Sequence, residues 1–325
     1  MNMKKNIVVI AGGNSSEYEV SIKSGNHIFS EVDGERYHKY LMILRGRDWH
    51  IEIGGEKYPV DKNDFSFDYQ GEKITFDFAY ITIHGNPGEN GMLQGYLDMM
   101  GVPYSTCSTL CEALTFDKYT CTNYLNGFGI NTTHPVMLTR GQAFDKEAVL
   151  GAVGLPCFVK PNAEGSSFGV SKVKTAEQFD AAIEEAFSKC REILVESFID
   201  GTEFTCGLYK VGDKKVIFPV AEVVPKKEFF DYEAKYDAKM SDEIIPGRFS
   251  EEITEQIQEM ASEVYDILRC EGIIRMDGFV RGDEVIMLEV NTTPGMTANS
   301  FIPKMVQVMG IQLRDVITEI IEAKS

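Results

Sequence analysis

Two short apolar runs, each followed by a glycine-rich loop and a helical pattern, constrain the fold of this chain more than any other feature. The first run covers residues 7–11 and the second covers residues 78–83, and apolar runs of this length are typical of buried strands. The second leads through the glycine-rich residues 84–91 into a helix predicted to begin near Met92. Repeated strand–loop–helix units predict an α/β fold whose N-terminal part, residues 1–105, is an open parallel sheet with helices.

Polar residues follow both strands at the edge where open α/β sheets bind ligands. Glu17 lies in the loop after the first strand, and His84 and Glu89 lie in the loop after the second. Ligand-contacting residues gather at the carboxyl ends of strands in such sheets. Ser16 and Glu19 have the spacing of a helix capping box, so a helix is predicted to open at Ser16.

The rest of the chain is predicted to form two further lobes, because 325 residues are enough for two or three compact units. Residues 106–196 are assigned to the second lobe and residues 197–325 to the third. In the second lobe Thr109 and Glu112 again have capping-box spacing, and the helical pattern that they open extends to about Leu125.

The third lobe combines an aperiodic stretch, a strong helix and a hairpin. Residues 229–248 are polar and without clean periodicity, which predicts a long loop of the kind that acts as a lid. A helix follows from the cap Ser250. The runs 272–280 and 285–291 then flank the turn residues 282–284 and predict a β-hairpin. The helix presents one apolar stripe, formed by Ile253, Ile257, Met260, Val264 and Ile267.

The predicted hairpin brings two carboxylates together. With a three-residue loop, Asp277 pairs with Glu289 and Arg275 with Asn291, and the two-residue side-chain period puts all four on one face. Like charges directly opposite each other destabilise a sheet by roughly 0.2–1 kcal/mol, and a bound cation removes that repulsion. Oxygen ligands of this kind suit Mg²⁺ rather than zinc. From the residues alone, a solvated strand face in which Arg275 neutralises the acids is an equal alternative.

The composition argues against several classes of function. Lys and Arg total 32 against 50 Asp and Glu, a net charge of −18, which disfavours a nucleic-acid partner because counterion release needs a basic surface. No apolar run is long enough for a signal sequence or a membrane span, so a cytoplasmic protein without a membrane partner is expected. The 7 cysteines include no CxxC pair, and no HExxH is present. Buried free thiols are therefore expected in place of a zinc site.

A magnesium–nucleotide site in this chain must hold phosphates without a P-loop, because the sequence contains no Gly-Lys dipeptide. Lys160 closes a predicted strand. Gly165 and Gly169 follow in a loop whose backbone N–H groups can approach phosphate oxygens. Lys118, in the preceding helical region, is a candidate for a second positive charge. For either lysine alone, a solvated surface position is the commoner outcome.

Six blocks of sequence form an ordered set that spans nearly the whole chain. The blocks are GGNSSEYEVS (12–21), HGNPGENGMLQG (84–95), KPNAEGSSFGV (160–170), DYEAKY (231–236), RMD (275–277) and LEVNTTPGMT (288–297). In their order and spacing they closely resemble the D-alanine–D-alanine ligases of the ATP-grasp superfamily. The resemblance implies an ATP-grasp fold for the second and third lobes, which follow the N-terminal α/β domain.

The resemblance implies a nucleotide site and a metal site. Lys118 and Lys160 would hold the phosphates of ATP, with Lys235 also in the ATP site. Glu196 and Glu203 would meet the adenine amino group and the ribose hydroxyls. The metal would be Mg²⁺ or Mn²⁺, with two ions expected, and its ligands would be Asp277, Glu289 and Asn291.

The resemblance also implies sites for two molecules of D-alanine. Glu17 would pair with the ammonium group of the first, and His84 would lie near its carboxylate. Ser300 and Lys235 would meet the carboxylate of the second. From the residues alone, Glu17 is equally well explained as a first-turn helix residue favoured by the helix dipole.

The implied reaction passes through an acyl phosphate. The carboxylate of one D-alanine attacks the γ-phosphate of ATP, and the amine of the second attacks the resulting carbonyl and expels phosphate. Arg275 and the backbone N–H of Gly295 would form the oxyanion hole. Tyr236 would join Ser166 and Glu17 in one hydrogen-bonded group. The product would serve peptidoglycan precursor synthesis and thereby cell-wall growth and cell shape, and the family resemblance suggests a homodimer.

Two kinds of alternative remain open. A ligase of the same fold could use D-lactate or D-serine as its second substrate, and Tyr236 favours D-alanine. A non-catalytic nucleotide-binding sensor is disfavoured because a sensor could dispense with several of the residues that are present. Those residues are Lys235, Arg275, Asp277, Glu289 and Asn291.

Overall fold

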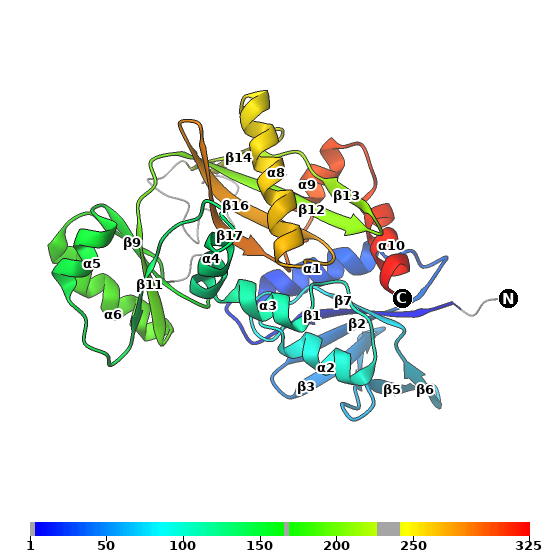
Figure 1. Ribbon diagram of the computed structural model, residues 1–325. Helices are drawn as coiled ribbons and strands as arrows, with labels where there is room; N and C mark the ends of the chain where they lie inside the picture. Colours follow the sequence, from blue (N-terminus) through cyan, green and yellow to red (C-terminus); the bar gives the residue numbers. More distant parts are fainter. Residues whose placement is uncertain (1–3, 166–168, 226–240) are drawn as a thin grey trace.

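Three main β-sheets and one small two-stranded sheet organise the part of the chain that the structure describes (Figure 1). The computed structural model describes residues 4–165, 169–225 and 241–325. Each main sheet forms within one of the three predicted segments, except that the last residue of the second sheet's strand β11, Ser197, falls one residue into the third. The exact boundaries of the segments stay a prediction.

The N-terminal sheet has the order β4-β3-β2-β1-β7. Its centre is parallel, as predicted: β1 (Asn6–Gly12) lies between β2 (His38–Arg45) and β7 (Phe78–Ile81). Its edge is not parallel, because β3 (Asp48–Ile53) and β4 (Glu56–Pro59) pair antiparallel. Each is joined to the preceding strand by a short turn, and such connections permit only antiparallel pairing. The predicted open parallel sheet is thus extended at one edge by two antiparallel strands. A separate hairpin, β5 (Ser66–Tyr69) and β6 (Glu72–Thr75), completes this region.

Helix α1 (Tyr18–Glu31) begins later than the predicted capping box requires. Glu17 occupies the N-cap position, and no side chain caps the helix. Ser15 organises the loop in place of Ser16: its hydroxyl accepts from the Glu17 N–H at 3.2 Å and donates to the His84 carbonyl at 2.7 Å. This tie to the neighbouring loop places Glu17 at the edge of the sheet. The second predicted helix, α2 (Met92–Met100), is confirmed.

The helical pattern predicted over residues 109–125 is confirmed as two helices, α3 (Thr109–Phe116) and α4 (Lys118–Asn126). Asp117 separates them and caps α4 by accepting from the Thr120 N–H at 2.8 Å. Ser108, not Thr109, is the N-cap of α3. The predicted capping box is therefore absent. Both helices pack against strand β17 (Glu284–Asn291) of the third sheet.

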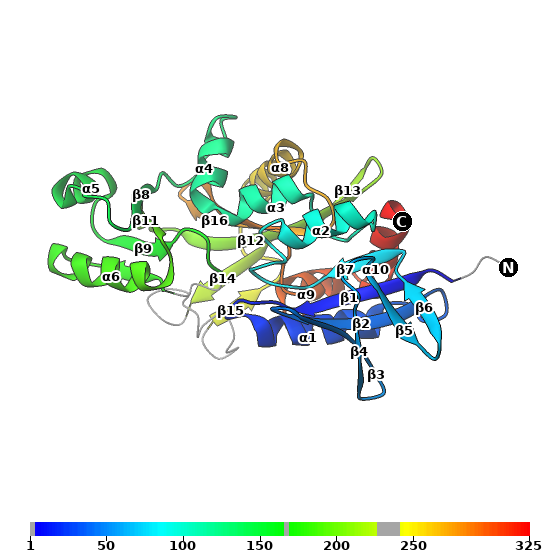
Figure 2. The same ribbon diagram turned by 90° about the horizontal axis from the view of Figure 1, so that it is seen from below.

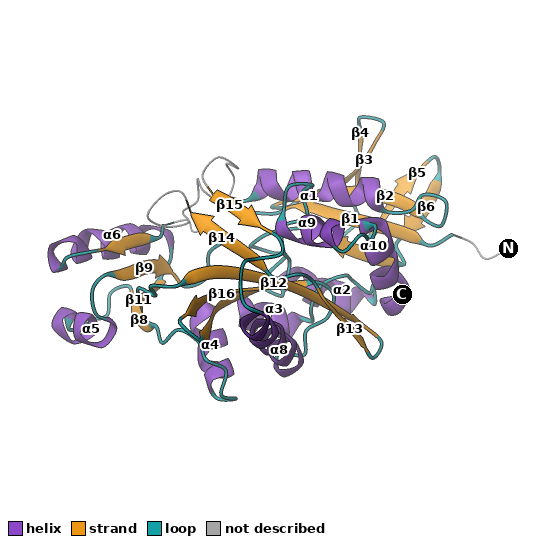
Figure 3. Ribbon diagram, turned by 90° about the horizontal axis from the view of Figure 1, so that it is seen from above, coloured by secondary structure: helices purple, strands orange, loops and turns teal. Residues whose placement is uncertain are grey.

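The second sheet is antiparallel and has the order β10-β9-β11-β8. Helices α5 (Lys146–Val153) and α6 (Phe179–Lys189) pack on it through one apolar cluster (Figure 3). A single 3-10 turn, η1 (Ala176–Gln178), precedes α6. The strands are β8 (Val136–Thr139), β9 (Cys157–Pro161), β10 (Ser171–Val173) and β11 (Glu192–Ser197).

The third sheet is also antiparallel. Its order is β15-β14-β12-β16-β17, with β13 paired to β12. Part of the predicted long loop, residues 241–244, is strand β15, which pairs with β14; residues 229–240 lie outside the described residues. The remaining strands are β12 (Thr202–Val211), β13 (Lys214–Ile217), β14 (Ala221–Pro225), β15 (Ser241–Ile244) and β16 (Ile274–Arg281).

Helices cover both faces of the third sheet. On one face α8 (Glu251–Ile267) shares an apolar cluster with α3, α4 and the strands. Its predicted cap is confirmed, since the Ser250 hydroxyl accepts from the Ile253 N–H at 3.2 Å. On the other face α9 (Phe301–Val308) and α10 (Leu313–Lys324) share a cluster with α1 and β1, so the first and third sheets are joined by one core (Figure 2). Among the helices that the structure describes, none combines the length and apolar character that a membrane crossing requires.

Candidate active site

A cavity of about 950 Å³ is lined by residues of the second and third sheets and their loops, and by the loops and helix α1 that follow strands of the N-terminal sheet. Of the site residues predicted from sequence, all those that the structure describes line this cavity. Ser166, Lys235 and Tyr236 lie outside the described residues. The predicted residues in the cavity wall are Glu17, His84, Lys118, Lys160, Glu196, Glu203, Arg275, Asp277, Glu289, Asn291, Gly295 and Ser300.

Strands β16 and β17 pair in the predicted register. Asp277 lies opposite Glu289 and Arg275 opposite Asn291, although the turn contains two residues rather than three. A β-bulge beyond Asp277 adds one residue to β17 and restores the predicted pairing. The two-residue turn is possible because Gly282, at its first position, has a φ of +61°.

Oxygen atoms converge on this strand pair. Asn291 Nδ2 donates to Asp277 Oδ2 at 3.0 Å, and the Thr205 hydroxyl donates to Asp277 Oδ1. Arg275 contacts the same carboxylate, with 2.7 Å between Nη2 and Oδ2. Lys118 Nζ lies 3.7 Å from Glu289 Oε2. The arrangement has two opposed carboxylates, an amide and no sulfur or imidazole, which is the ligand chemistry that fits a hard cation such as Mg²⁺.

A second ion pair lies where the second sheet meets the cavity. Lys160 Nζ and Glu196 Oε2 are 2.6 Å apart, and both side chains are almost fully buried. The Thr133 hydroxyl also donates to Glu196, at 3.2 Å. Lys118 is the first residue of α4, and its Nζ donates to the Glu164 carbonyl at 2.8 Å. Lys118 and Lys160 thus both point into the cavity, where their present partners are a backbone oxygen and a carboxylate oxygen. The oxygen atoms of a bound polyanion can take the place of these partners.

Phe158 is a cavity residue that the sequence analysis missed. It lies two residues before Lys160 in β9, so the two-residue period of the strand puts both side chains on the same face. Phe198 also lines the cavity, with 6.1 Å between the two ring centroids. The strand period was the signal that would have identified Phe158. These rings add an apolar wall beside the buried ion pair.

Glu17 reaches across the cavity to the loop that follows β9. A Cβ atom placed on Gly165 would lie 2.1 Å from Glu17 Oε2, so the carboxylate lies directly against the Gly165 backbone. The two residues come from the N-terminal and second predicted lobes. Only glycine at position 165 leaves room for this approach.

His84 is buried at the end of the loop after β7. Its Nδ1 donates to the Thr293 carbonyl at 3.0 Å in the neutral ring, which leaves Nε2 as an acceptor without a partner among the described residues. Burial lowers the pKa of His84, and the nearby Glu17 carboxylate opposes that change. His84 is therefore a neutral hydrogen-bond acceptor at the wall of the cavity.

Glu89, which the sequence placed on this loop without assigning it a role, also lines the cavity. The Gly85 N–H donates to its Oε2 at 2.6 Å. Burial, and then the negative charge of Glu17, raise the pKa of Glu89 to about 8. Two carboxyl groups therefore lie close together here, and Glu89 is the one that holds a proton at neutral pH.

Replacing Glu89 with Gln should make stability less sensitive to pH between about 4.5 and 8. The pKa of Glu89 rises from 4.5 to about 8 in the folded protein, so the folded state holds a proton in this window that the unfolded state has lost. The contribution of Glu89 to the stability of the unmodified protein then falls as pH rises through the window. Gln keeps an oxygen for the Gly85 N–H and carries no charge. Urea unfolding at both ends of the window measures the two slopes, and equal slopes would contradict the raised pKa.

The loop between β17 and α9 is held in place by α1. The Met296 N–H donates to the Ser24 hydroxyl at 3.3 Å, and His27 Nδ1 contacts the Met296 carbonyl at 2.7 Å. Within the loop, the Ser300 hydroxyl accepts from the Thr297 N–H at 3.1 Å. Ser24 and His27 were missed from the sequence, because their role depends on how α1 docks against a distant loop.

Comparison with known proteins identifies the family. The family model of the D-ala D-ala ligase N-terminus matches residues 6–107, and that of the C-terminus matches residues 124–322. A D-alanine–D-alanine ligase of Bacteroides fragilis is 53% identical over 99% of this chain and 100% of its own length.

Solved structures give the same assignment. The D-Ala:D-Ser ligase VanG of Enterococcus faecalis is 32% identical, with a TM-score of 0.85 over 99% of both chains. The D-alanine–D-alanine ligase of Bacillus anthracis, solved as a complex with ATP, is 30% identical, with a TM-score of 0.80 over 99% of this chain and 97% of that one. The sequence blocks, the cavity that gathers residues of those blocks that the structure describes, and these full-length matches together place the chain in the D-alanine–D-alanine ligase family, with the ATP-grasp fold.

Proposed function

We propose that this chain uses ATP to join two molecules of D-alanine through a D-alanyl phosphate intermediate, for peptidoglycan precursor synthesis. The observation that supports this most is the gathering of the predicted residues, from three lobes and widely separated blocks, around one cavity. The cavity combines cationic, carboxylate and apolar walls. An ATP-dependent ligase needs all three to hold a nucleotide, a metal ion and two amino acids.

ATP occupies the part of the cavity between the second and third sheets. Lys118 and Lys160 bind its phosphates and exchange their present oxygen partners for phosphate oxygens. Glu196 accepts from the adenine amino group, and Glu203 from the ribose hydroxyls. Phe158 contacts the base. Lys235, outside the described residues, is assigned to the same site.

Asp277, Glu289 and Asn291 would hold Mg²⁺ or Mn²⁺, with two ions expected. Asp277 and Glu289 lie opposite each other across β16 and β17, and the Asn291 amide contacts Asp277. Two carboxylates and an amide fit such an ion. The ion would neutralise negative charge on the phosphates. Lys118, which lies 3.7 Å from Glu289, adds positive charge at the same place.

The two D-alanine molecules lie between the N-terminal loops and the β17–α9 loop. Glu17 binds the ammonium group of the first, while His84 lies near its carboxylate. Ser300 binds the carboxylate of the second. The family resemblance assigns Lys235 to the same carboxylate, and it assigns Ser166 and Tyr236 to a hydrogen-bonded group with Glu17. These last three residues, Lys235, Ser166 and Tyr236, lie outside the described residues.

The chain acts mainly by positioning and by charge. It holds the first carboxylate in line with the γ-phosphate, so that a carboxylate oxygen forms a bond to phosphorus as ADP leaves. The second amine then attacks the acyl carbon. Arg275 and the Gly295 N–H stabilise the oxyanion that forms, and phosphate leaves with the bridging oxygen. No covalent bond to the protein is needed.

The proposal is tested by supplying ATP and D-alanine and measuring phosphate release and product mass together. We expect phosphate in equal amount to D-alanyl-D-alanine, and none without D-alanine. Absence of D-alanine-dependent phosphate would identify a non-catalytic sensor. D-Lactate and D-serine are supplied in competition, because the similarity to a D-Ala:D-Ser ligase means that the fold alone does not fix the second substrate. A depsipeptide or D-alanyl-D-serine as the main product would contradict the proposal.

Replacing Gly165 with Ala should weaken binding of the first D-alanine without unfolding the protein. The new methyl group would displace the Glu17 carboxylate, 2.1 Å from the added Cβ, and the end of a glutamate side chain moves at small cost. Losing a hydrogen bond to a charged group costs roughly 1.5–3 kcal/mol, or about one to two decades in kcat/KM for D-alanine.

The KM for ATP and the melting temperature should change little in this variant. Gly151→Ala, in α5 with open space around it, is the matched control and should leave both substrates unaffected. Unchanged kcat/KM for D-alanine in Gly165→Ala would show that Glu17 does not bind the ammonium group.

We further propose a cytoplasmic homodimer. The neighbouring helices α2 and α3 support a subunit interface, because Met92, Met99 and Leu110 expose 65%, 77% and 72% of their surface. All three are large apolar side chains. A second copy of the chain is the partner that would cover them.

A further inference from the structure

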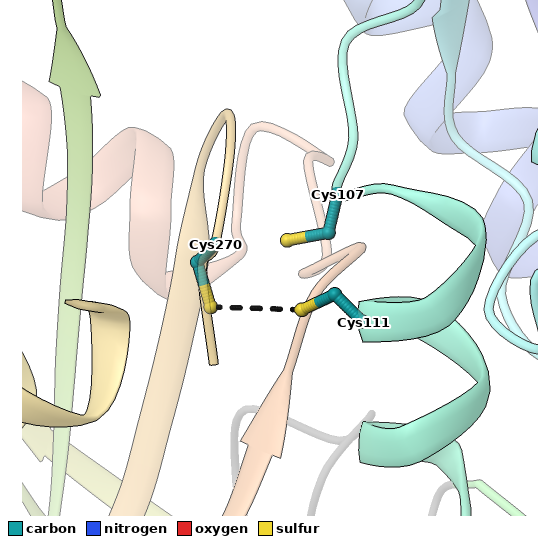
Figure 4. A group of neighbouring side chains, drawn as sticks. All are labelled: Cys107, Cys111 and Cys270. Atoms are coloured by element: carbon teal, nitrogen blue, oxygen red, sulfur yellow. Dashed lines mark hydrogen bonds between the residues drawn. The ribbon is translucent and has the colours of Figure 1, made fainter. Parts of the chain in front are cut away.

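Three buried cysteines lie together outside the cavity. Cys107 precedes α3, Cys111 lies within α3, and Cys270 lies between α8 and β16. Figure 4 shows that their side chains point toward one another. The three sulfur atoms lie within 4.8 Å of one another, and those of Cys111 and Cys270 are 3.8 Å apart. This is the one such group of potential metal ligands among the described residues.

We infer that Cys107, Cys111 and Cys270 form a three-thiolate site for one thiophilic metal ion, of the Zn²⁺ or Cu⁺ class. Metal–thiolate bonds are about 2.3 Å long. In tetrahedral or trigonal geometry that length separates two sulfurs by about 3.8–4.0 Å. The Cys111–Cys270 separation of 3.8 Å matches this spacing, whereas a disulfide would bring the sulfurs to about 2.05 Å.

Backbone hydrogen bonds hold one of the three sulfurs in place. The Glu271 N–H donates to Cys107 Sγ at 3.3 Å, and the Cys107 thiol donates to the Glu271 carbonyl at 3.2 Å. Such bonds orient metal-binding sulfurs. A metal ion would replace the thiol protons of the group.

The coordination number limits the class of ion. Within the described residues, no fourth His, Cys, Asp or Glu belongs to the group. The Glu112 carboxylate is engaged elsewhere, accepting from the Cys107 N–H at 3.0 Å and the Thr292 hydroxyl at 2.5 Å. Cu⁺ is satisfied by three thiolates, while Zn²⁺ would need a water or a backbone carbonyl. Hard cations such as Mg²⁺ are excluded by the sulfur ligands.

A bound ion would tie α3 and the segment before it to the connection between α8 and β16. Cys107, Cys111 and Cys270 are 0%, 2% and 7% exposed, so the ion would be shielded from water and slow to exchange. Because a preformed site is absent from the unfolded chain, binding adds directly to folding stability. We therefore expect the melting temperature to rise when the site is filled.

The test uses the full chain, freed of metal with a chelator under a phosphine reductant. Cd²⁺, as a spectroscopic substitute for Zn²⁺, and Cu⁺ under anaerobic conditions are added in separate arms. Each ion is also supplied during expression, so that slow entry into a buried site does not hide binding. The readouts are the thiolate-to-metal charge-transfer band, the metal content per chain and the melting temperature. We expect one thiolate-bound ion per chain in at least one arm, with a higher melting temperature.

Variants separate this site from other cysteines and from the cavity. Cys270→Ser, and Cys270→Ala if the serine variant unfolds, should lose the band and the rise in melting temperature. Cys190→Ser, a half-buried thiol outside the group, should keep both. Cd²⁺ bound by Asp277 and Glu289 would give no thiolate band.

Three results would overturn the inference. The first is the absence of a band in both arms, including protein expressed with the metal. The second is an equal band in Cys270→Ser. The third is recovery of the chain, purified without reductant, as a Cys111–Cys270 disulfide that has lost two hydrogens in mass and fails to bind metal after reduction. That last outcome would identify a redox pair in place of a metal site.

Discussion

Glu289→Gln is expected to abolish ligase turnover while leaving the protein folded. The substitution keeps the size and one oxygen of the side chain but removes the charge that faces Asp277 across β16 and β17. Charge stabilisation by a metal ion contributes several kcal/mol to such reactions, which corresponds to about three decades in rate. Stability should change little, because the lost ion pair with Lys118 at 3.7 Å is offset by relief of the repulsion from Asp277, each worth about 1 kcal/mol or less.

The measurement is kcat over a titration of Mg²⁺ and of Mn²⁺, together with the melting temperature. Glu284→Gln is the matched control: it lies on the same strand, is exposed, and pairs with Arg281 far from the cavity. The control should keep full activity. Near-normal turnover of Glu289→Gln at saturating metal would remove the metal assignment.

Arg275→Lys is expected to lower kcat by about 10²–10³ with a small change in the KM for ATP. Removing one donor from an oxyanion hole costs this much in enzymes that use one. Lysine keeps a positive charge near Asp277, but it lacks the planar fork that now contacts that carboxylate through Nε and Nη2. The substitution thus distinguishes a transition-state donor from a residue that only neutralises an acid.

The two roles predict different outcomes for this variant. If Arg275 served only to balance Asp277, Arg275→Lys would retain most of the activity and Arg275→Met alone would lose it. If Arg275 binds the oxyanion, both variants lose kcat. Arg281→Lys, on the same strand and exposed, is the control and should behave like the unmodified protein. Retention of near-normal kcat in Arg275→Lys would contradict the oxyanion assignment.

Local sequence patterns were sufficient where the structure depends on neighbours along the chain. The apolar runs at 7–11 and 285–291 are strands, and the capped stripe after Ser250 is a helix. The pairing of Asp277 with Glu289 was predicted correctly, although for an incomplete reason. The turn is one residue shorter than expected, and the bulge in β17 compensates for it.

Patterns failed where tertiary contacts decide the structure. Ser16 has the spacing of a cap, yet the hydroxyl of Ser15 is held by the His84 carbonyl and sets the start of α1. Glu112 has capping-box spacing, yet it is fully buried and accepts from Thr292. Residues 241–244 were predicted as loop because nothing in this stretch of sequence reveals its pairing with strand β14. The spacing of residues along the chain does not reveal which distant group will form a hydrogen bond with a potential capping side chain.

The residues of the candidate site also divide into those that the sequence revealed and those that it did not. The charged residues of the cavity were found because their sequence blocks resemble those of a known family. Phe158 was missed although the strand period pointed to it. Cys270 was not linked to Cys107 and Cys111, because more than 150 residues separate it from Cys111 and only the fold brings them together.

Activation of D-alanine as an acyl phosphate requires one of its carboxylate oxygens to pass to phosphate. D-Alanine labelled with ¹⁸O in its carboxylate is supplied with unlabelled ATP, and the released phosphate is analysed by mass spectrometry. We expect one ¹⁸O atom in each phosphate released with dipeptide, because the bridging oxygen comes from the carboxylate of the first D-alanine. Unlabelled phosphate alongside accumulating dipeptide would rule out an acyl phosphate.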